Sequence, residues 1–239
     1  MGSLIRQLVR DRLGRAGAAT LALLCLVALA ADLLASDLPL ILSRGGELYL
    51  LPAVTRPPSL RDQDNQRLKG ELSRGKDGWA IYPLCEYGPE QQPEILRPPP
   101  ASPDGRHWLG TDDWGRDVFA RLVHGTRTSL LVGFCSVAVY LLIGVTLGLL
   151  AGYLRGGVDF FISRLIELGL TFPAFFLILV IMALLERSSI WTLIIVLGLT
   201  SWTGVARLVR AEALRIRELD FITAARAYGA SPGRIMLRH

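Results

Sequence analysis

The residues whose types could support catalysis in this chain are few and lie far apart. A phosphate-binding loop needs a lysine followed by serine or threonine after a glycine pair, whereas Lys69 precedes a glycine and Lys76 an aspartate. The histidines His107, His124 and His239 have no metal-ligand spacing, and no G-x-S-x-G motif occurs. The sequence therefore predicts no catalytic centre, no metal and no cofactor, so any ATP hydrolysis would take place on another subunit.

Two carboxylates lie within or beside apolar segments, where an ionisable group is expensive and marks a transport pathway by default. Glu167 lies about one turn inside its segment, and Asp32 lies near the end of another. Arg164 precedes Glu167 by three residues, a spacing that also allows an ion pair on the helix surface. Glu167 thus stays open as a candidate for the pathway or as a structural ion pair. A proton-coupled carrier or ion channel is disfavoured, because such proteins place ionisable groups at mid-membrane.

A third polar group precedes the longest apolar segment. Asp112, Arg116 and Asp117 bring charges of both signs within six positions. They could contact a substrate or form a local salt-bridged turn. Charged clusters at a membrane surface are usually structural, so we expect Asp117→Ala to impair folding rather than specificity.

The apolar residues are clustered into long segments. The chain has 239 residues, of which 51% are hydrophobic, and a formal net charge of +5. A membrane-spanning helix needs roughly 20 apolar residues, and four segments approach or exceed this length. We therefore expect an all-α membrane protein, a polytopic bundle of transmembrane helices. Its expected divisions are a cytoplasmic N-terminus (1–15), transmembrane helix 1 (16–35), an extracytoplasmic loop region (36–127), helix 2 (128–154), a cytoplasmic loop (155–164), helix 3 (165–185), helix 4 (188–206) and a cytoplasmic coupling region (207–239).

Charge sets the expected orientation of these helices. Arginines flank the start of the chain and the 155–164 segment, and seven arginines against three acids follow residue 206. The positive-inside rule places all three flanks in the cytoplasm, so the basic excess indicates membrane orientation and not nucleic-acid binding. The first segment also resembles a signal peptide ending at Ala28-Leu29-Ala30, and a retained anchor or a cleaved signal stays open. Cys25, Cys85 and Cys135 are too scattered for a disulfide framework.

The 36–127 region is rich in proline and predicts a small extracytoplasmic insertion with little core of its own. A short strand pair is expected around residues 40–42 and 48–50, joined by Gly45-Gly46. The region could be a solvated spacer. Alternatively, the chain could be a membrane-anchored extracytoplasmic binding or scaffold module, with this region as its working part.

Helix 2 carries Gly144, Gly148 and Gly152 on one face. Small residues at this spacing allow two helix backbones to approach closely in lipid. We expect this face to pack on another helix, either within the chain or in another subunit.

The arginine-rich tail contains a short amphipathic pattern. Phe221, Ala224, Ala225 and Tyr228 lie at positions i, i+3, i+4 and i+7, on one helix face. Asp220 could cap the start of this helix and Gly229 could stop it. Ser231-Pro232 then resembles the start of a second helix. A short helix, a break and a new helix just beyond a membrane span predict a docking element.

Several of these blocks resemble one known family, the permease subunits of oligopeptide and dipeptide ABC importers. The match covers about residues 107–239 and suggests the microcin-C-type peptide permease subgroup. The matching blocks are His107-Trp-Leu-Gly-Thr-Asp-Asp-Trp-Gly-Arg-Asp117, Gly148-Leu-Leu-Ala-Gly-Tyr153, Arg164 through Pro173, Arg207-Leu-Val-Arg-Ala211 and Ala224-Ala-Arg-Ala-Tyr-Gly-Ala-Ser231. The resembling motif outside the membrane comprises Gly110, Thr111, Asp112, Gly115, Arg116 and Asp117.

The resemblance implies a bundle of the type I ABC importer fold in the bacterial cytoplasmic (inner) membrane. It implies as partners ATP-binding subunits, a second permease subunit, an extracytoplasmic substrate-binding protein, a peptide and membrane lipid. It also implies that an E-A-A-x-x-x-G element docks on the ATP-binding subunit. Ala224, Ala225 and Gly229 match this element, and Thr223 stands at its glutamate position. Since the family continues into two further helices, the resemblance implies a C-terminally truncated chain with four of six helices.

Overall fold

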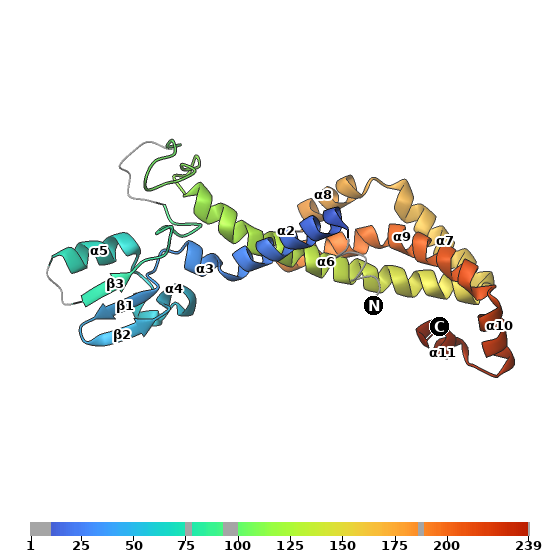
Figure 1. Ribbon diagram of the computed structural model, residues 1–239. Helices are drawn as coiled ribbons and strands as arrows, with labels where there is room; N and C mark the ends of the chain where they lie inside the picture. The colour runs from blue at the N-terminus through green and yellow to red at the C-terminus, as the bar shows by residue number, and fades with distance from the viewer. Residues whose placement is uncertain (1–10, 75–77, 93–99, 186–188, 239) are drawn as a thin grey trace. The chain divides into compact units, whose positions relative to one another are not determined.

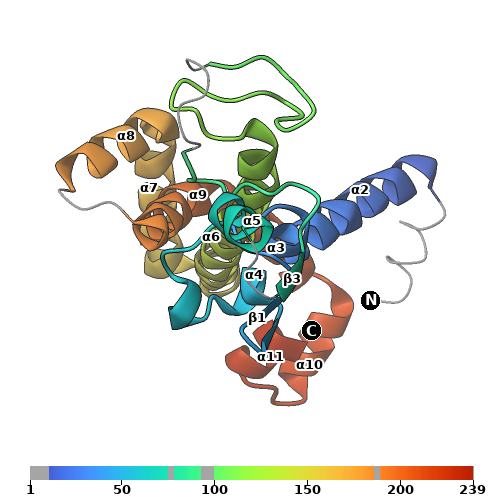
Figure 2. The same cartoon turned by 90° about the vertical axis from the view of Figure 1, so that its left-hand side faces the viewer.

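The computed structural model describes residues 11–74, 78–92, 100–185 and 189–238. Most of the expected cytoplasmic N-terminus and the expected outer turn at 186–187 therefore lie outside the described residues. The chain divides into two compact units, Met1–Leu130 and Leu131–His239. Figures 1 and 2 label the helices and strands of the two units.

The first unit begins with an apolar helix, α2 (Arg12–Leu29), followed after Ala30 by the short α3 (Ala31–Leu34). The expected single helix 16–35 is therefore interrupted near its end. Leu26 and Leu29 expose 63% and 79% of their surface, as expected for a helix that faces lipid.

The insertion after α3 has a fold with its own core, which the sequence did not predict. Three antiparallel strands form a sheet in the order β2-β1-β3: β1 (Ile41–Arg44), β2 (Glu47–Leu50) and β3 (Gly78–Ile81). Its helices are α4 (Pro52–Thr55), the 3₁₀ turn η1 (Pro58–Leu60) and α5 (Asn65–Ser73). The expected strand pair is confirmed, with Gly45 and Gly46 at positive φ in the turn.

The core of the insertion is built from four leucines, Leu38, Leu42, Leu60 and Leu68. They come from a loop, from β1, from η1 and from α5, and each is less than 5% exposed. Because these leucines come from four separate segments of the chain, no single hydrophobic period in the sequence predicts this core. The sheet adds strands to the helical fold that the sequence predicts.

The second unit holds most of the long helix α6 (Val118–Leu154), which starts ten residues before the expected helix 2. Asp117 explains the earlier start, because its carboxylate accepts a hydrogen bond from the N–H of Ala120 at 2.7 Å and caps the helix. The extra turns of α6 are amphipathic and belong to the first unit.

The expected helix 3 (165–185) is instead formed by parts of two helices, α7 (Gly156–Thr171) and α8 (Ala174–Leu184), bent by 84°. The break falls at Phe172 and Pro173. Proline lacks an N–H and forces the preceding residue into extended backbone, and Phe172 has ψ 130°. The expected cytoplasmic loop 155–164 is mostly helical in the structure, since α7 begins at Gly156.

The last long helix, α9 (Ile190–Arg217), continues eleven residues beyond the expected end of helix 4. No glycine or proline interrupts it after Gly204, so charged residues extend the helix past the apolar segment. Among the described residues, α2, α6 and α9 are long and apolar enough to span a membrane, and the bent pair α7–α8 would make a fourth span.

Glycines on α6 form a close seam with α9. A Cβ added at Gly144, Gly148 or Gly152 would lie within 3 Å of α9 atoms, including backbone carbonyl oxygens of Trp202, Ala206 and Arg210. The seam is therefore an internal helix contact of the chain. Beside it, Ala151, Ile162, Ile166 and Ala206 form a buried cluster that joins α6, α7 and α9.

We expect Gly148→Val to destabilise this seam strongly. The new Cβ would lie 2.7 Å from the Ala206 carbonyl oxygen and 2.8 Å from Val209 Cβ. Overpacking of this kind costs roughly 1–3 kcal/mol of stability. The midpoint temperature of thermal unfolding in detergent should therefore fall by about 5 °C. Gly133→Val is the matched control, because the space around Gly133 on the same helix is open. Equal losses for the two variants would contradict the seam.

Candidate functional site

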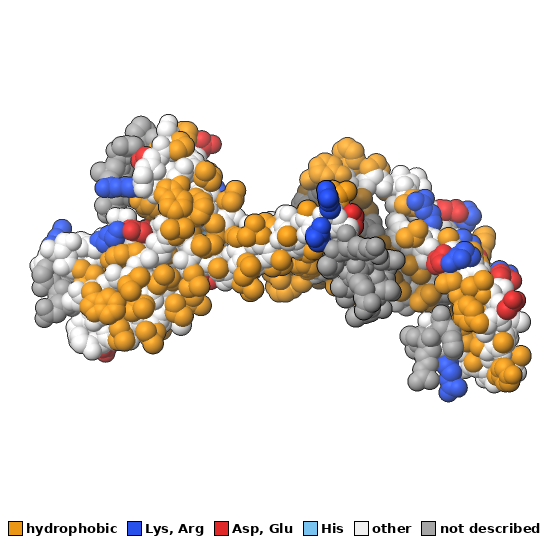
Figure 3. All heavy atoms as spheres, viewed as in Figure 1, with side chains coloured by type: hydrophobic (Ala, Val, Ile, Leu, Met, Phe, Trp, Pro, Cys, Tyr) orange, Lys and Arg blue, Asp and Glu red, His pale blue; other side chains and the backbone are white. Residues whose placement is uncertain are grey.

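The tail forms a protruding helix, α10 (Asp220–Ala227), directly after α9. Ile222 is 1% exposed and fixes α10 to the protein, whereas Phe221 is 51% and Tyr228 is 92% exposed. Figure 3 shows hydrophobic side chains interspersed with basic and acidic ones at this end of the second unit. Of the residues on the predicted face, Phe221, Ala224 and Tyr228 are exposed and Ala225 is half-buried, while Thr223, Arg226 and Ala227 elsewhere on this segment are exposed too. Sequence reasoning missed Ile222, since it lies outside that spacing.

A Schellman turn ends α10. Gly229 has φ +80°, its N–H donates to the Arg226 carbonyl at 2.9 Å, and the Ala230 N–H donates to the Ala225 carbonyl at 3.0 Å. The predicted glycine stop is confirmed by this geometry. Asp220 differs from its predicted place, because Leu219 precedes the helix and Asp220 is its first residue.

The helix after the turn, α11 (Pro232–Arg238), starts as predicted. The Ser231 hydroxyl accepts a hydrogen bond from the Arg234 N–H at 3.4 Å, and Pro232 occupies the first helical position, where no N–H is needed. The break between α10 and α11 is thus set by backbone conformation and capping at both ends.

Arginines tie the base of α10 to the end of α6. The Arg217 guanidinium donates to the Tyr153 carbonyl in the last turn of α6, and Arg226 of α10 lies over the Tyr153 ring at 5.2 Å. Just after α6, Arg155 pairs with Glu218 at 2.6 Å. Arg226 thus links α10 to the end of α6, and Arg217 and Glu218 link the end of α9 to the α6–α7 junction.

An ion pair joins α7 to α9. Arg210 donates from Nε and Nη2 to the two carboxylate oxygens of Asp159, at 2.5 and 2.8 Å. The Ser163 hydroxyl donates to the same carboxylate at 3.1 Å. Since the Arg210 carbonyl also faces Gly152, three helices meet at this arginine. Sequence reasoning missed the pair, because its members lie 51 positions apart and nothing local couples them.

The two carboxylates considered for a transport pathway both lie in ion pairs. Glu167 pairs with Arg164 at 2.7 Å, and both side chains are more than half exposed. Asp32, in the first unit, pairs with Arg127 at 2.9 Å. The geometry matches the structural interpretation of Glu167, and within the described residues no group of three metal-ligating side chains occurs.

The 110–117 motif forms a tight turn before α6. Gly110 and Gly115 adopt positive φ of 74° and 76°, and the Thr111 hydroxyl accepts a hydrogen bond from the Ala101 N–H. Asp112 pairs with Arg116 at 2.8 Å and with Arg121.

Asp112 stays charged at any physiological pH. Desolvation raises its pKa, but hydrogen bonds from Arg116 and from the Trp114 N–H outweigh this and lower the pKa to about 2. Because this folded-state pKa lies below the usual unfolded value of about 3.9, the stabilisation is present above that value. It is lost as pH falls through the folded pKa of about 2.

Asp117 is the buried centre of the turn, and we expect Asp117→Ala to unfold this region. Its carboxylate caps α6, accepts from His107 Nδ1 at 2.8 Å and contacts the Cys85 thiol. Losing a cap costs about 1 kcal/mol, and leaving a buried hydrogen-bonding group without its partner costs roughly 1–3 kcal/mol. Thermal unfolding should therefore show a loss of stability of about 2 kcal/mol or more.

The exposed Asp113, in the same turn, provides the control for this prediction, and Asp113→Ala should be neutral. The Cys85 thiol gives a second readout. Burial raises the pKa of this thiol to about 12, so maleimide should modify it slowly in the native chain and rapidly in Asp117→Ala. An unchanged labelling rate would contradict the structural role.

Comparison with known proteins shows similarity to membrane transport permeases. Residues 144–239 match the family model of the binding-protein-dependent transport system inner membrane component. The chain is 43% identical over 137 residues to a dipeptide transport system permease protein of Alkalihalophilus pseudofirmus, covering 57% of this chain and 45% of that protein. It is 32% identical over 227 residues to an inner membrane ABC transporter permease protein of Escherichia coli, covering 89% and 64%.

A peptidoglycan transport system permease protein of Agrobacterium fabrum is 31% identical over 250 aligned positions, covering 91% of this chain and 65% of that protein. The chain thus spans less than two thirds of the length of each of these relatives. The last two alignments include the insertion between α3 and α6, since they cover most of the chain. The relatives are named as transport proteins and not as enzymes.

Proposed function

We propose that this chain, whose residues 144–239 belong to the binding-protein-dependent inner-membrane transport family, is a permease subunit of an ATP-driven peptide importer. The observation that carries the proposal is α10, a short helix that exposes Phe221 and Tyr228 while Ile222 holds it in place. An exposed apolar face of this kind marks a protein interaction site. Relatives named for dipeptide and peptidoglycan transport support a peptide-containing substrate.

In this proposal the apolar face of α10 binds in a groove of an ATP-binding subunit, which supplies the energy. Small residues at Ala224 and Ala225 allow close approach, and the turn at Gly229 directs α11 away from the contact. ATP-driven closure of two such subunits moves α10. The arginine contacts with Tyr153 and Glu218 then transmit the motion to α6 and α7.

The remaining partners follow from the same proposal. A second permease subunit completes the translocation pathway, and an extracytoplasmic binding protein delivers the peptide. The exposed phenylalanines of α7 and α8, such as Phe161 and Phe175, provide apolar surface for the second subunit or for lipid. The alternative, a membrane-anchored extracytoplasmic binding or scaffold module, gains from the core of the insertion, but it gives α10 no role.

The test is recovery of the ATP-binding subunit on the purified chain. The double variant Phe221→Ser and Tyr228→Ser should reduce recovery at least tenfold, since it removes the apolar contact without touching the buried Ile222. Thr223→Ser, an exposed change on the same helix, is the matched control and should leave recovery unchanged. Full recovery with the double variant would rule out this docking surface.

A further inference from the structure

A polar groove runs along α5 in the insertion of the first unit. One hollow of about 680 Å³ lies between α5 and the segment that contains Tyr87 and Gln91. A second hollow of about 260 Å³ lies beside it and extends to Trp108. Both hollows are lined by Gln66, Tyr87 and Arg106, so they form one elongated groove with a shared centre.

The lining favours a ligand that carries amide groups and a negative charge. Four glutamines face the first hollow, and the buried side-chain oxygen of Gln63 accepts no hydrogen bond from the described residues. An unsatisfied buried acceptor is costly unless a ligand or water donates to it. Asp64 and Glu71, which also line this hollow, pair with Arg67 and Arg44. The exposed Arg74 and Arg106 form no ion pair within the part of the chain that the structure describes. Most small-molecule sites are mainly apolar. The glutamines and arginines of this groove instead suit a polar ligand.

The wall of the groove is built directly on the start of α6. Tyr87 is 6% exposed, packs with Ala35 and Ala120, and stacks on His107 at a centroid distance of 4.3 Å. His107 in turn binds Asp117, the cap of α6. A ligand beside Tyr87 therefore lies close to the first turn of a helix that runs into the second unit.

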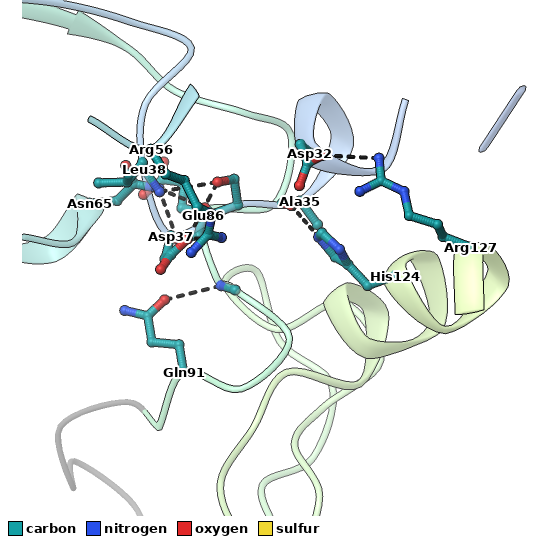
Figure 4. A network of polar contacts seen from close by, with 12 residues as sticks. Asp32, Ala35, Asp37, Leu38, Arg56, Asn65, Glu86, Gln91, His124 and Arg127 are labelled. Carbon is teal, nitrogen blue, oxygen red and sulfur yellow. Dashed lines mark hydrogen bonds and ion pairs between the residues drawn. The ribbon is translucent and has the colours of Figure 1, made fainter. Parts of the chain in front are cut away.

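Further contacts fix the groove to the helices of the first unit, as Figure 4 shows. Asn65, the first residue of α5, donates to the carbonyls of Ser36 and Glu86. His124 of α6 lies 2.8 Å from the Ala35 carbonyl, and Arg127 pairs with Asp32. Hydrogen bonds and an ion pair thus connect α5 and α6 to the segments beside the groove.

We propose that this groove binds a short peptide and that Arg106 holds its carboxylate. Arg106 lines both hollows, and its positive charge acts on the neighbouring Tyr87. Guanidinium groups bind carboxylates by two parallel hydrogen bonds, and the glutamine amides can pair with peptide N–H and C=O groups. The peptide class rests on the proposed function, and the site adds a substrate contact on the permease itself.

The experiment measures peptide binding to the full chain in lipid nanodiscs by calorimetry, without any ATP-binding subunit or binding protein. The probes are trialanine and its C-terminal amide, which lacks the carboxylate. We expect trialanine to bind at least tenfold more tightly than the amide. Arg106→Gln should weaken the binding of trialanine at least tenfold and leave the binding of the amide unchanged. The preference for the free carboxylate should therefore disappear.

Arg61→Gln is the matched control, because Arg61 is exposed just before α5 and lines neither hollow. It should keep the preference for trialanine. Unchanged thermal unfolding of Arg106→Gln would show that the variant is folded. The proposal is overturned if trialanine gives no binding heat or if Arg106→Gln keeps the preference. This assay contains no ATP-binding subunit, and the α10 test contains no peptide, so either proposal can fail without the other.

Discussion

Gly229→Val is expected to reduce recovery of the ATP-binding subunit on the purified chain at least tenfold. At φ +80° a β-branched side chain is strongly disfavoured. The variant would therefore give up the hydrogen bonds from Gly229 to Arg226 and from Ala230 to Ala225. α10 would then extend or fray, and α11 would leave its position. Co-purification of the two subunits from detergent measures the effect.

Two controls separate the turn from a general effect on the tail. Gly229→Asn should keep most of the recovery, because asparagine tolerates the left-handed conformation. Gly233→Val changes the same residue types in α11, where the space is open and φ is not positive. Loss with Gly233→Val equal to that with Gly229→Val, or no loss with either, would contradict a specific role for the turn.

The second large effect is expected at the Asp159–Arg210 pair between α7 and α9. The side chains are 20% and 31% exposed, so removing one partner leaves a half-buried charge unpaired. Breaking a buried pair costs roughly 3–5 kcal/mol, and we expect Asp159→Ala and Arg210→Ala each to cost about 2 kcal/mol at this partial burial. The double variant should cost no more than either single change, because no unpaired charge remains.

This double-mutant cycle is measured by thermal unfolding in detergent of the parent protein, the two single variants and the double variant. The exposed pair Glu212–Arg215 on α9, with side chains 53% and 67% exposed, serves as the control. Its cycle should give a coupling below about 1 kcal/mol. Additive losses at Asp159 and Arg210 would show that the pair does not join the two helices.

The ATP hydrolysis rate of the assembled transporter should also depend on the Asp159–Arg210 pair. If Asp159 and Arg210 position α7 for motion driven from α10, Asp159→Ala should lower peptide-stimulated ATP hydrolysis of the assembled transporter more than basal hydrolysis. A merely structural role would lower both rates together. The ratio of the two rates at a temperature where the variant stays folded decides between these outcomes.

The sequence predicted the parts of the fold that depend on local pattern. The apolar segments, the close face of Gly144, Gly148 and Gly152, and the turn at Gly229 follow from composition, small-residue spacing and backbone conformation, all of which act within a few residues. The structure then assigned the glycine face to α9, a choice that local sequence left open.

The parts that the sequence missed depend on contacts between distant residues. The core around Leu42 and Leu68 brings together leucines from four separate segments, and Arg210 of α9 pairs with Asp159 of α7. The bend at Phe172 and Pro173 had a local signal, yet a proline within an apolar segment is compatible with a kinked helix as well as with a full break. Both α7 and α8 contact α9, and a pattern within one segment does not encode such contacts.

The proposed coupling depends most directly on α10 lying on the cytoplasmic side and contacting the ATP-binding subunit. Tyr228→Cys, in a background where Cys25, Cys85 and Cys135 are replaced by alanine, can be labelled with a membrane-impermeant maleimide. We predict labelling in inside-out vesicles but not in intact spheroplasts, and at least tenfold slower labelling when the ATP-binding subunits are bound. Labelling from outside, or an equal rate with and without those subunits, would contradict the account.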